Sequence, residues 1–470
     1  MAVQIRSGRT PSDRSPVTGA ARADHRLALL DQAFYEGHRA AGQREVMQVG
    51  WVYERAVDLD HLELFRTRLA QGLLGRLIER SPLPFGRHRW VRDPHPPGLD
   101  ISLGVRPRSA LTDWFDECTQ LPIDPESGPG WRISVTPLAD GATAVSLVLS
   151  HYVIDGIGAA IAVTEALMNL PRPLDYPPPR SRAVLPALAQ DLGETLRDAP
   201  SVGRALSAAA REARRRARDA ERSHPAPTVA MPTAGSDDPV IAPSAWVRIP
   251  LDEWSACAER LGGTAGTLAA AFTAKLDERM GRTHGTADGV SMLLTVNDRT
   301  TADDARAIAV KFIRVGIDPT TVTGDLRSAR AAVKQALKAA QETPDEAADL
   351  VALTPFTPAR GWRQLAEYAL NDPEQPAVCS NLGDTGPAAI RPDGTLCDVA
   401  FARGASQHLT GRRLERIGSQ LHVYYGTAME INLVTIYLCG FQPATVSTKA
   451  DLRGLTAQVL DEFNLSGDIE

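Results

Sequence analysis

Residues 147–156 read Leu147-Val148-Leu149-Ser150-His151-Tyr152-Val153-Ile154-Asp155-Gly156, an apolar run that stops at a histidine and ends in an Asp-Gly pair. The alternating pattern from Val145 to Leu149 predicts a short β-strand. Gly156 breaks this strand, and the apolar residues after it recur at helical spacing. We therefore expect His151 at the point where a strand passes into a helix.

His151 is a candidate general base. Histidine is the side chain whose ordinary pKa lies closest to neutral pH, so it can take and return a proton without a large pKa shift. A histidine that merely satisfies hydrogen bonds at a strand end is the alternative. Asp155 either orients His151 directly or anchors the loop through an arginine, and the sequence leaves both roles open.

The motif resembles the His-His-x-x-x-Asp-Gly signature of the CoA-dependent acyltransferase superfamily. That superfamily includes chloramphenicol acetyltransferase, nonribosomal peptide condensation domains and the wax ester synthase/diacylglycerol acyltransferase group. Here the second histidine is kept as His151 and the first is replaced by Ser150. Further segments are similar to the wax ester synthase-like branch, in the same order along the chain. They are Leu30–Phe34 and Met47–Gly50 as an opening strand region, Arg89–Pro94, Gly128–Arg132, and the loop Cys379-Ser380-Asn381-Leu382-Gly383.

The resemblance implies an α/β fold with two chloramphenicol acetyltransferase-like half-domains in a V-shaped arrangement around a central tunnel. It also implies an acyltransferase of specialised metabolism that makes an ester or an amide. The acyl donor would be a thioester of CoA or of a carrier protein acting in trans, and the acceptor a small alcohol or amine. His151 would remove the acceptor proton during direct transfer. One departure argues against wax or triacylglycerol synthesis: Gly266–Ala269 replaces the Asn-Asp pair of that branch.

The resemblance also assigns supporting roles. Asp155 would point away from the substrate and pair with an arginine, with Arg299 as the first choice. Arg76 and Arg132 are alternatives, and Gly156 would be needed because a side chain there would crowd the loop. Candidate donors to the oxyanion are the backbone N–H groups of Gly156 and Ile157 and the Asn381 side chain, although Asn381 could equally be a turn residue. Ser150, Ser380, Asn381 and Gly383 are expected to line the substrate site.

Composition is that of a globular enzyme with two domains. The chain has 470 residues, 43% of them apolar, and a formal net charge of −6, which argues against a general nucleic-acid binder. There is no run long enough to span a membrane and no signal peptide in the polar N-terminus, so we expect a cytoplasmic protein. The cysteines are scattered without metal-ligand spacing, and neither a metal nor a cofactor is predicted. They are Cys118, Cys257, Cys379, Cys397 and Cys439.

The expected organisation follows changes in composition along the chain. Residues 1–24 are expected to be a disordered tail, 25–200 one half-domain, 201–244 a connector, and 245–470 the second half-domain. The connector consists of an Arg-rich helix, Arg204–Arg222, and a Pro-rich linker from Ser223. Further expected elements are strands at Trp246–Ile249, Met292–Val296 and Ile431–Leu438, and helices at Leu268–Met280 and Leu452–Phe463.

Two other functions stay open. Ser150 and the missing Asn-Asp pair are compatible with a catalytically silent docking module that recruits a carrier protein or a partner enzyme. An enzyme that makes lipids at a membrane surface would need an exposed apolar patch or an amphipathic basic helix, and Arg204–Arg222 has the charge but no Trp or Phe. The presence of His151, Asp155 and Gly156 together favours catalysis, because a surface that only recruits a partner has no need of all three.

Overall fold

The computed structural model describes residues 25–470 except 173, 223–234, 283–288, 302, 343–349 and 371–374. The predicted disordered tail, 1–24, therefore lies outside the described residues. The same holds for the part of the predicted linker at 223–234.

The first sheet has five strands in the order β11-β1-β6-β5-β4. These are β1 (Glu45–Tyr53), β4 (Leu99–Ile101), β5 (Trp131–Pro137), β6 (Thr143–Ser150) and β11 (Val399–Ser406). Side chains of β6 alternate between the two faces of the sheet. Leu147 and Leu149 pack with helices α1 (Leu29–Ala40), α2 (Leu59–Gln71) and α4 (Gly156–Leu167). Val148 packs on the other face with α3 (Leu111–Thr119).

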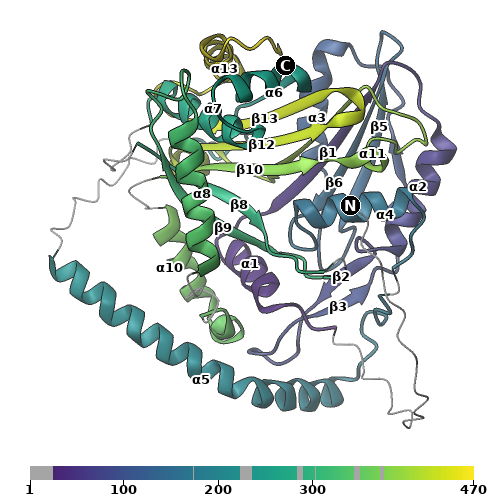
Figure 1. The fold of residues 1–470 in the computed structure, drawn as a ribbon. Coiled ribbons are helices and arrows are strands. Elements are labelled where there is room, and N and C mark those ends of the chain that lie inside the picture. The colour runs from purple at the N-terminus through teal and green to yellow at the C-terminus, as the bar shows by residue number, and fades with distance from the viewer. Residues whose placement is uncertain are drawn as a thin grey trace, which may run out of the picture.

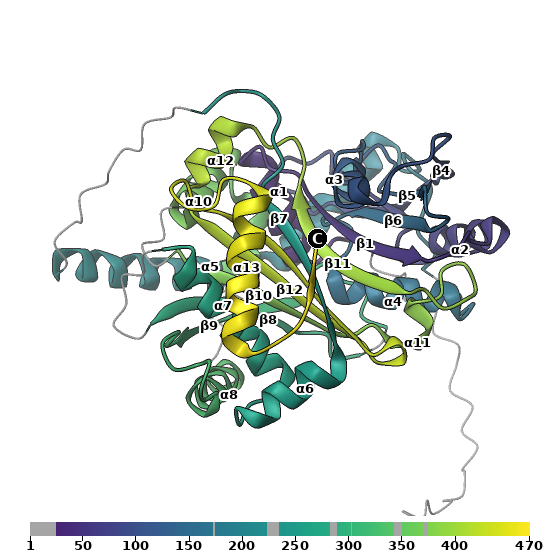
Figure 2. The same ribbon diagram turned by 90° about the horizontal axis from the view of Figure 1, so that it is seen from above.

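The second sheet has seven strands in the order β14-β7-β13-β12-β10-β8-β9. These are β7 (Ser244–Pro250), β8 (Val290–Asn297), β9 (Val310–Ile317), β10 (Ala377–Asp384), β12 (Gln420–Ala428), β13 (Leu433–Phe441) and β14 (Asp468–Ile469). Trp254, Phe272, Ala329 and Val459 come from four helices that bury their apolar sides in one core with this sheet (Figure 2). The helices are α6 (Leu251–Arg260), α7 (Ala265–Arg279), α8 (Arg327–Glu342) and α13 (Lys449–Phe463).

The two sheets are tied together at several points. β11 lies between β10 and β12 in the chain but pairs with β1, so it belongs to the first sheet (Figure 2). Phe401 of β11 packs against Trp246 and Tyr437 of the second sheet. The loop between β8 and β9 also reaches the first sheet's helices, where Asp31 of α1 accepts backbone N–H groups of Ala307 and Ile308 at 3.0 and 2.8 Å.

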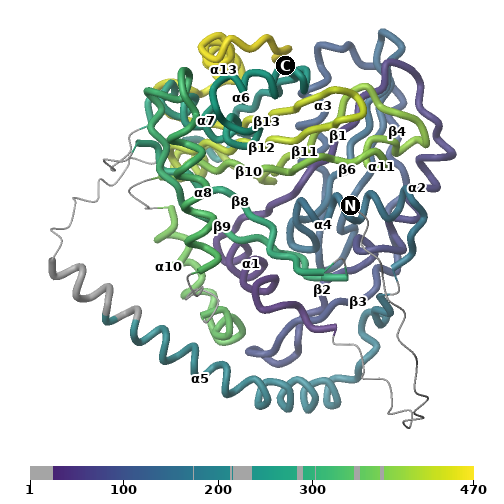
Figure 3. Tube along the Cα trace, in the orientation of Figure 1, coloured from purple at the N-terminus to yellow at the C-terminus, as the bar shows by residue number. Residues whose placement is uncertain are grey.

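Helix α5 (Val184–Arg222) spans 39 residues and runs along the outside of the molecule (Figures 1 and 3). It begins well before the predicted Arg204. The remaining elements are β2 (Arg76–Glu79), β3 (Arg89–Arg92), η1 (Arg108–Ala110), η2 (Val351–Phe356), α10 (Ala359–Leu370), α11 (Gly386–Ala389), α12 (Gly411–Ile417) and η3 (Met429–Ile431). None of the helices in the described part of the chain has both the length and the apolar character that crossing a bilayer requires.

The strands and helices that were predicted from strong local patterns are confirmed. They are β6, β7, β8, α4, α7 and α13. The strand predicted from Ile431 begins at Leu433. The expected opening strand at Leu30–Phe34 is wrong, because this segment lies in α1 and only Met47–Gly50 is in a strand. Leu30 and Phe34 are four residues apart, which places both on one side of a helix against the core.

Candidate active site

His151 follows β6 directly and is held in place by its backbone and its ring. Its N–H donates to the carbonyl of Glu45 on β1 at 3.0 Å. Its ring packs against Phe34 of α1, with the ring centroids 5.0 Å apart. Nδ1 is buried and has no hydrogen-bond partner among the described residues, while the residue as a whole is partly exposed. The accessible edge of the ring is therefore the one that carries Nε2.

The environment of His151 favours the neutral imidazole. Burial lowers its pKa below the ordinary value of 6.5, and the charge of His38 lowers it further, whereas nearby backbone carbonyls and Asp155 oppose the shift. A neutral imidazole is the form that accepts a proton. At neutral pH the His151 ring is thus in the form that can accept a proton.

We expect the rate of any reaction in which His151 acts as a base to fall on the acid side with a midpoint below pH 6.5, because the lowered pKa of His151 keeps the ring unprotonated to a lower pH. The same shift makes acid oppose folding, since the unfolded chain takes up the proton more readily. Rates measured between pH 4.5 and 8, after a check that the protein stays folded across the range, test this expectation. A midpoint at or above pH 6.5 contradicts it.

Asp155 has its carboxylate turned into the protein. It is the N-cap of α4 and accepts the backbone N–H of Gly158 at 2.8 Å. Its other partners lie in the loop between β8 and β9. Arg299 Nη1 lies 2.8 Å from a carboxylate oxygen of Asp155, and the Ala309 N–H donates to this carboxylate at 2.7 Å. Both side chains of the ion pair are almost fully buried. Asp155 therefore connects the start of α4 to the loop between β8 and β9.

The two alternative arginines bind elsewhere. Arg76 donates to the Val153 carbonyl at 2.7 Å and to the Ala305 carbonyl at 2.7 Å, and its guanidinium lies over the Trp90 ring at 4.0 Å. Arg76 thus holds the loop that carries Asp155, but it does so through the Val153 carbonyl and not through the Asp155 carboxylate. Arg132 donates to the Pro122 carbonyl at 2.9 Å. Arg299 is the arginine that the structure brings to Asp155.

Ser150 lies on the face of the sheet opposite to His151. It pairs with Val46 in the β1–β6 register, and its hydroxyl accepts the Tyr152 N–H at 3.3 Å. The side chain is buried. Because adjacent residues of a strand point to opposite faces, this hydroxyl and the accessible edge of His151 are separated by the sheet.

The predicted loop of the second half comes close to the start of α4. Leu382 lies 3.4 Å from where a side chain at Gly156 would begin, a contact that the flexible leucine end can relieve. The stronger need for glycine is at Gly158, where a Cβ would lie 2.7 Å from Ile154 and 3.0 Å from Arg299. The expected steric role therefore falls mainly on Gly158, which sequence reasoning missed.

The remaining loop residues differ in their surroundings. Asn381 is exposed and its side-chain oxygen accepts the Gly383 N–H at 2.9 Å, which makes a local turn. Its amide nitrogen faces Gly266 at the start of α7. Ser380 is buried within β10, and Gly383 has a φ of 73°, a conformation that favours glycine.

Glu45 is a site residue that the sequence did not indicate. It lies opposite His151 across the β1–β6 pair, so the two side chains share one face of the sheet. Its carboxylate accepts the Ser406 hydroxyl at 2.9 and 3.0 Å. Burial raises the pKa of Glu45, while His38 opposes the shift. Only the register of β1 against β6 could have revealed this neighbour.

His38 and Tyr424 complete the surroundings of Glu45 and His151. His38 of α1 has Nδ1 2.8 Å from the Phe34 carbonyl, and its ring lies 4.2 Å from that of Phe34. The Tyr424 hydroxyl lies where a side chain at Gly404 would begin, and burial raises its pKa. Among the described residues, no group of three or more His, Cys, Asp or Glu side chains could hold a metal ion.

Comparison with solved structures identifies the fold. The first condensation domain of the calcium-dependent antibiotic synthetase is similar with a TM-score of 0.55 at 14% identity, over 94% of this chain and 96% of that one. Polyketide synthase associated protein 5 from Mycobacterium tuberculosis is similar with a TM-score of 0.53 at 15% identity, over 93% and 98%. No protein-family model matches the sequence, and no curated protein is similar enough to count as a match. The chain has the mixed α/β fold of condensation domains.

Proposed function

We propose that the chain is an acyltransferase that moves an acyl group from a CoA or carrier-protein thioester to an alcohol or amine. The observation that carries this proposal is the state of His151. Its pKa is lowered, Nδ1 is buried and the opposite edge of the ring is accessible. The neighbouring carboxylate of Asp155 is paired with Arg299. That arrangement suits a general base that removes a proton from the alcohol or amine that accepts the acyl group. The condensation-domain fold supports the choice of an acyl thioester as donor.

The proposed reaction is a direct transfer. His151 Nε2 takes the proton of the acceptor as its oxygen or nitrogen attacks the thioester carbon. The carbon–sulfur bond then breaks, and the thiol leaves with the proton that His151 returns. The first two backbone N–H groups of α4, those of Gly156 and Ile157, precede the first intrahelical hydrogen bonds and are the proposed donors to the oxyanion.

Glu45 bears on the choice between the two acceptor classes. An alkylammonium acceptor loses two protons on its way to an amide, whereas an alcohol loses one on its way to an ester. The Glu45 carboxylate has one neutral hydroxyl donor, Ser406, and shares a face of the sheet with His151. It therefore supplies a second proton acceptor, which favours the amine.

The proposed architecture is a pair of half-domains, 25–200 and 245–470, in a V-shaped arrangement around a tunnel, with 201–244 between them. Two sheets with separate helical layers support this division. The contribution of β11 to the first sheet makes the first half-domain structurally dependent on the second. His151, Glu45 and Tyr424 retain exposed surface deep within the protein, as residues along an internal passage would.

The proposal is tested by mass spectrometry of products. The full chain is supplied with a panel of acyl-CoA and acyl carrier-protein donors and with matched amine and alcohol acceptors. A condensation domain of rhizomide synthetase, similar at a TM-score of 0.50, has been solved with C8-CoA, so medium-chain acyl-CoA is the first donor to try. We expect an ester or amide that forms only with both substrates present. Carrier-protein binding without any transfer would instead support the silent docking module.

Ser150→Ala is expected to keep most of the activity, because Ser150 lies across the sheet from the accessible edge of His151. With donor but without acceptor, the intact mass of the wild-type protein should stay unchanged, and two-substrate kinetics should be sequential. A stable acyl adduct on Ser150 together with an inactive alanine variant would reject direct transfer.

A further inference from the structure

Glu45 is the middle member of a row of polar side chains at one end of the first sheet. His151 lies opposite it after β6, and Ser406 lies opposite it on β11. Side chains that face each other on neighbouring strands have their Cβ atoms about 5 Å apart on the same face of the sheet. A small molecule whose reacting atom lies at His151 is therefore within reach of the Glu45 carboxylate.

Helix α12 brings Arg413 to the far side of this row. The helix begins shortly after β11 ends, and its N-cap Thr410 accepts the Arg413 N–H at 3.2 Å. Arg416 lies one turn further along the same side of α12 and pairs with Glu367 of α10 (Figure 2). Arg413 therefore projects from the side of α12 that faces α10.

Arg413 and Glu45 lie near each other without forming an ion pair. Burial raises the pKa of Glu45 and lowers that of Arg413, and the charge of each residue opposes the shift of the other. Its neighbours Arg412 and Arg416 each have a carboxylate within 4.0 Å, but Arg413 has none among the described residues. The charges of Glu45 and Arg413 are therefore separated by more than the length of a direct ion pair.

The guanidinium of Arg413 has no partner of its own in the part of the chain that the structure describes. No hydrogen-bond acceptor meets it there, and Glu367 is already paired with Arg416. The side chain is half-buried, and burial together with the charge of Arg416 lowers its pKa. A half-buried charge without a partner costs free energy. An anion bound at Arg413 would remove that cost.

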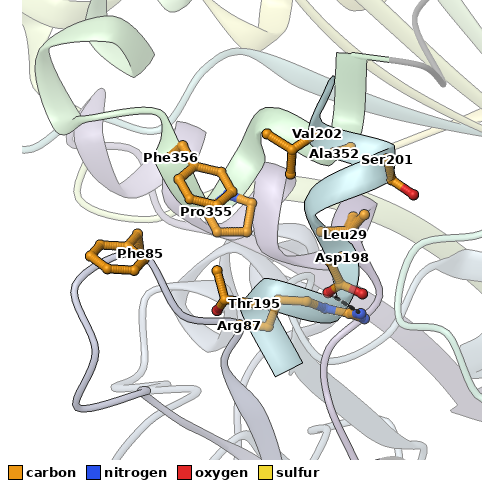
Figure 4. Close-up of a pocket in the computed structure, with 10 residues that line it drawn as sticks. All are labelled: Leu29, Phe85, Arg87, Thr195, Asp198, Ser201, Val202, Ala352, Pro355 and Phe356. Atoms are coloured by element: carbon orange, nitrogen blue, oxygen red, sulfur yellow. Dashed lines mark ion pairs between the residues drawn. The ribbon is translucent and has the colours of Figure 1, made fainter. Parts of the chain in front are cut away.

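Arg87 shows the more usual arrangement of an arginine beside a cavity. Figure 4 shows it lining a cavity of about 70 Å³ together with Phe85 and Phe356. There Arg87 pairs with Asp198 at 3.9 Å and donates to the Leu27 carbonyl at 3.1 Å. Because the protein itself balances this charge, the cavity in Figure 4 does not require an anion.

A ligand with both an ammonium and a carboxylate group matches the charges of Glu45 and Arg413. Its ammonium group lies at Glu45 beside His151, and its carboxylate meets the planar fork of Arg413. A phosphate in place of the carboxylate would bring a second negative charge toward Glu45, which is unfavourable. We propose that the acceptor is an amino acid with a free carboxylate, bound by Arg413 and Glu45. This inference rests on the proposed acyl transfer and names its acceptor.

Acylation of an amino acid balances with the groups at the site. One ammonium proton goes to Glu45, and His151 takes the second as the nitrogen attacks the thioester carbon. The carbon–nitrogen bond forms, the carbon–sulfur bond breaks, and the thiolate leaves with the proton from His151. The products are an N-acyl amino acid and a free thiol, and the proton on Glu45 passes to solvent.

The first test compares acceptors that differ only in the carboxylate. Glycine, L-leucine and L-phenylalanine are each supplied beside the matching amide and the matching amine without a carboxyl group, with octanoyl-CoA as donor. We expect kcat/KM for at least one amino acid to exceed that of both its analogues by about tenfold or more, the usual worth of a hydrogen bond to a charged group. The amino acid is intermediate in basicity between its two analogues, so basicity does not explain such a preference. Equal or faster acylation of the analogues in all three sets would overturn the inference.

Arg413→Met removes the charge and keeps an unbranched side chain. It should raise KM for the amino acid by about tenfold or more, with kcat and the KM of the amide changed far less. Arg413→Lys should recover part of the affinity, because the charge is kept and the fork is lost. Arg330→Met is the control, since Arg330 is exposed on α8 and has no ion pair among the described residues. An equal loss for amino acid and amide in Arg413→Met would show a structural role and overturn the inference.

Binding is measured separately from turnover, by saturation-transfer NMR of the amino acids with the full chain. We expect a signal with the wild type that Arg413→Met abolishes and Arg330→Met keeps. If no donor and acceptor react, the proposed acyl transfer fails, but binding that depends on Arg413 would still support an amino-acid site there. Acyl transfer to amines without a signal, or with a signal that Arg413→Met keeps, overturns this inference alone. No signal and no reaction would overturn both.

Discussion

Replacing His151 with alanine is expected to lower turnover by roughly a hundredfold to ten-thousandfold, which is the usual contribution of a general base. The loss follows from the position of the ring, whose accessible edge lies on the face of the sheet that His151 shares with Glu45. Stability should change by about 1 kcal/mol or less, because the ring is partly exposed and its Nδ1 has no hydrogen-bond partner among the described residues. Initial rates and thermal unfolding of the same preparation measure both effects.

His95→Ala is the matched control for His151→Ala. His95 is exposed and lies in the loop between β3 and β4. It should leave both rate and melting temperature as they are in the wild type. If His151→Ala retained activity within a fewfold of wild type, His151 would have no part in the proton transfer.

Asp155→Asn is expected to destabilise the protein by about 3–5 kcal/mol, the usual cost of removing one partner of a buried ion pair. Asparagine can still cap α4 by accepting the Gly158 N–H, so the loss reports the pairing with Arg299 together with the hydrogen bond from the Ala309 N–H. Turnover should fall as well, because the loop that carries His151 loses its tie to the β8–β9 loop. Urea unfolding and initial rates are the measurements.

An exposed pair provides the comparison for Asp155→Asn. Asp325 and Arg327 lie 2.7 Å apart at the surface, so Asp325→Asn should lower the stability far less than Asp155→Asn does. A double-mutant cycle with Asp155→Asn and Arg299→Gln isolates the coupling between the two side chains. A coupling near zero would show that Asp155 does not anchor the loop through Arg299.

The sequence predicted those elements whose signals are local. β6 and α4 follow from alternating and helical patterns within a few residues of His151. The start of α5 was missed because Pro186 and Pro200 argue against a continuous helix. Asp155 and Arg299 were paired by resemblance, since no local pattern links residues so far apart in the chain.

Glu45 shows what local patterns leave out. Its place beside His151 depends on the register between β1 and β6, and a shift of one residue would turn its side chain to the other face. The position of β11 in the first sheet depends on contacts with residues far earlier in the chain. Such pairings are set by the whole fold, which a single sequence does not display.

The pairing of β11 with β1 has a consequence for how the protein is made. On the ribosome, β1 and β6 emerge early, but residues 399–406 emerge only when most of the chain has been synthesised. Until then β1 is an unpaired sheet edge beside buried apolar strands, and such edges readily join other chains. Pairing over so long a separation also slows folding. Nascent chains that stall before residue 399 should therefore aggregate or recruit chaperones, and fragments that end there should not yield a stable first sheet.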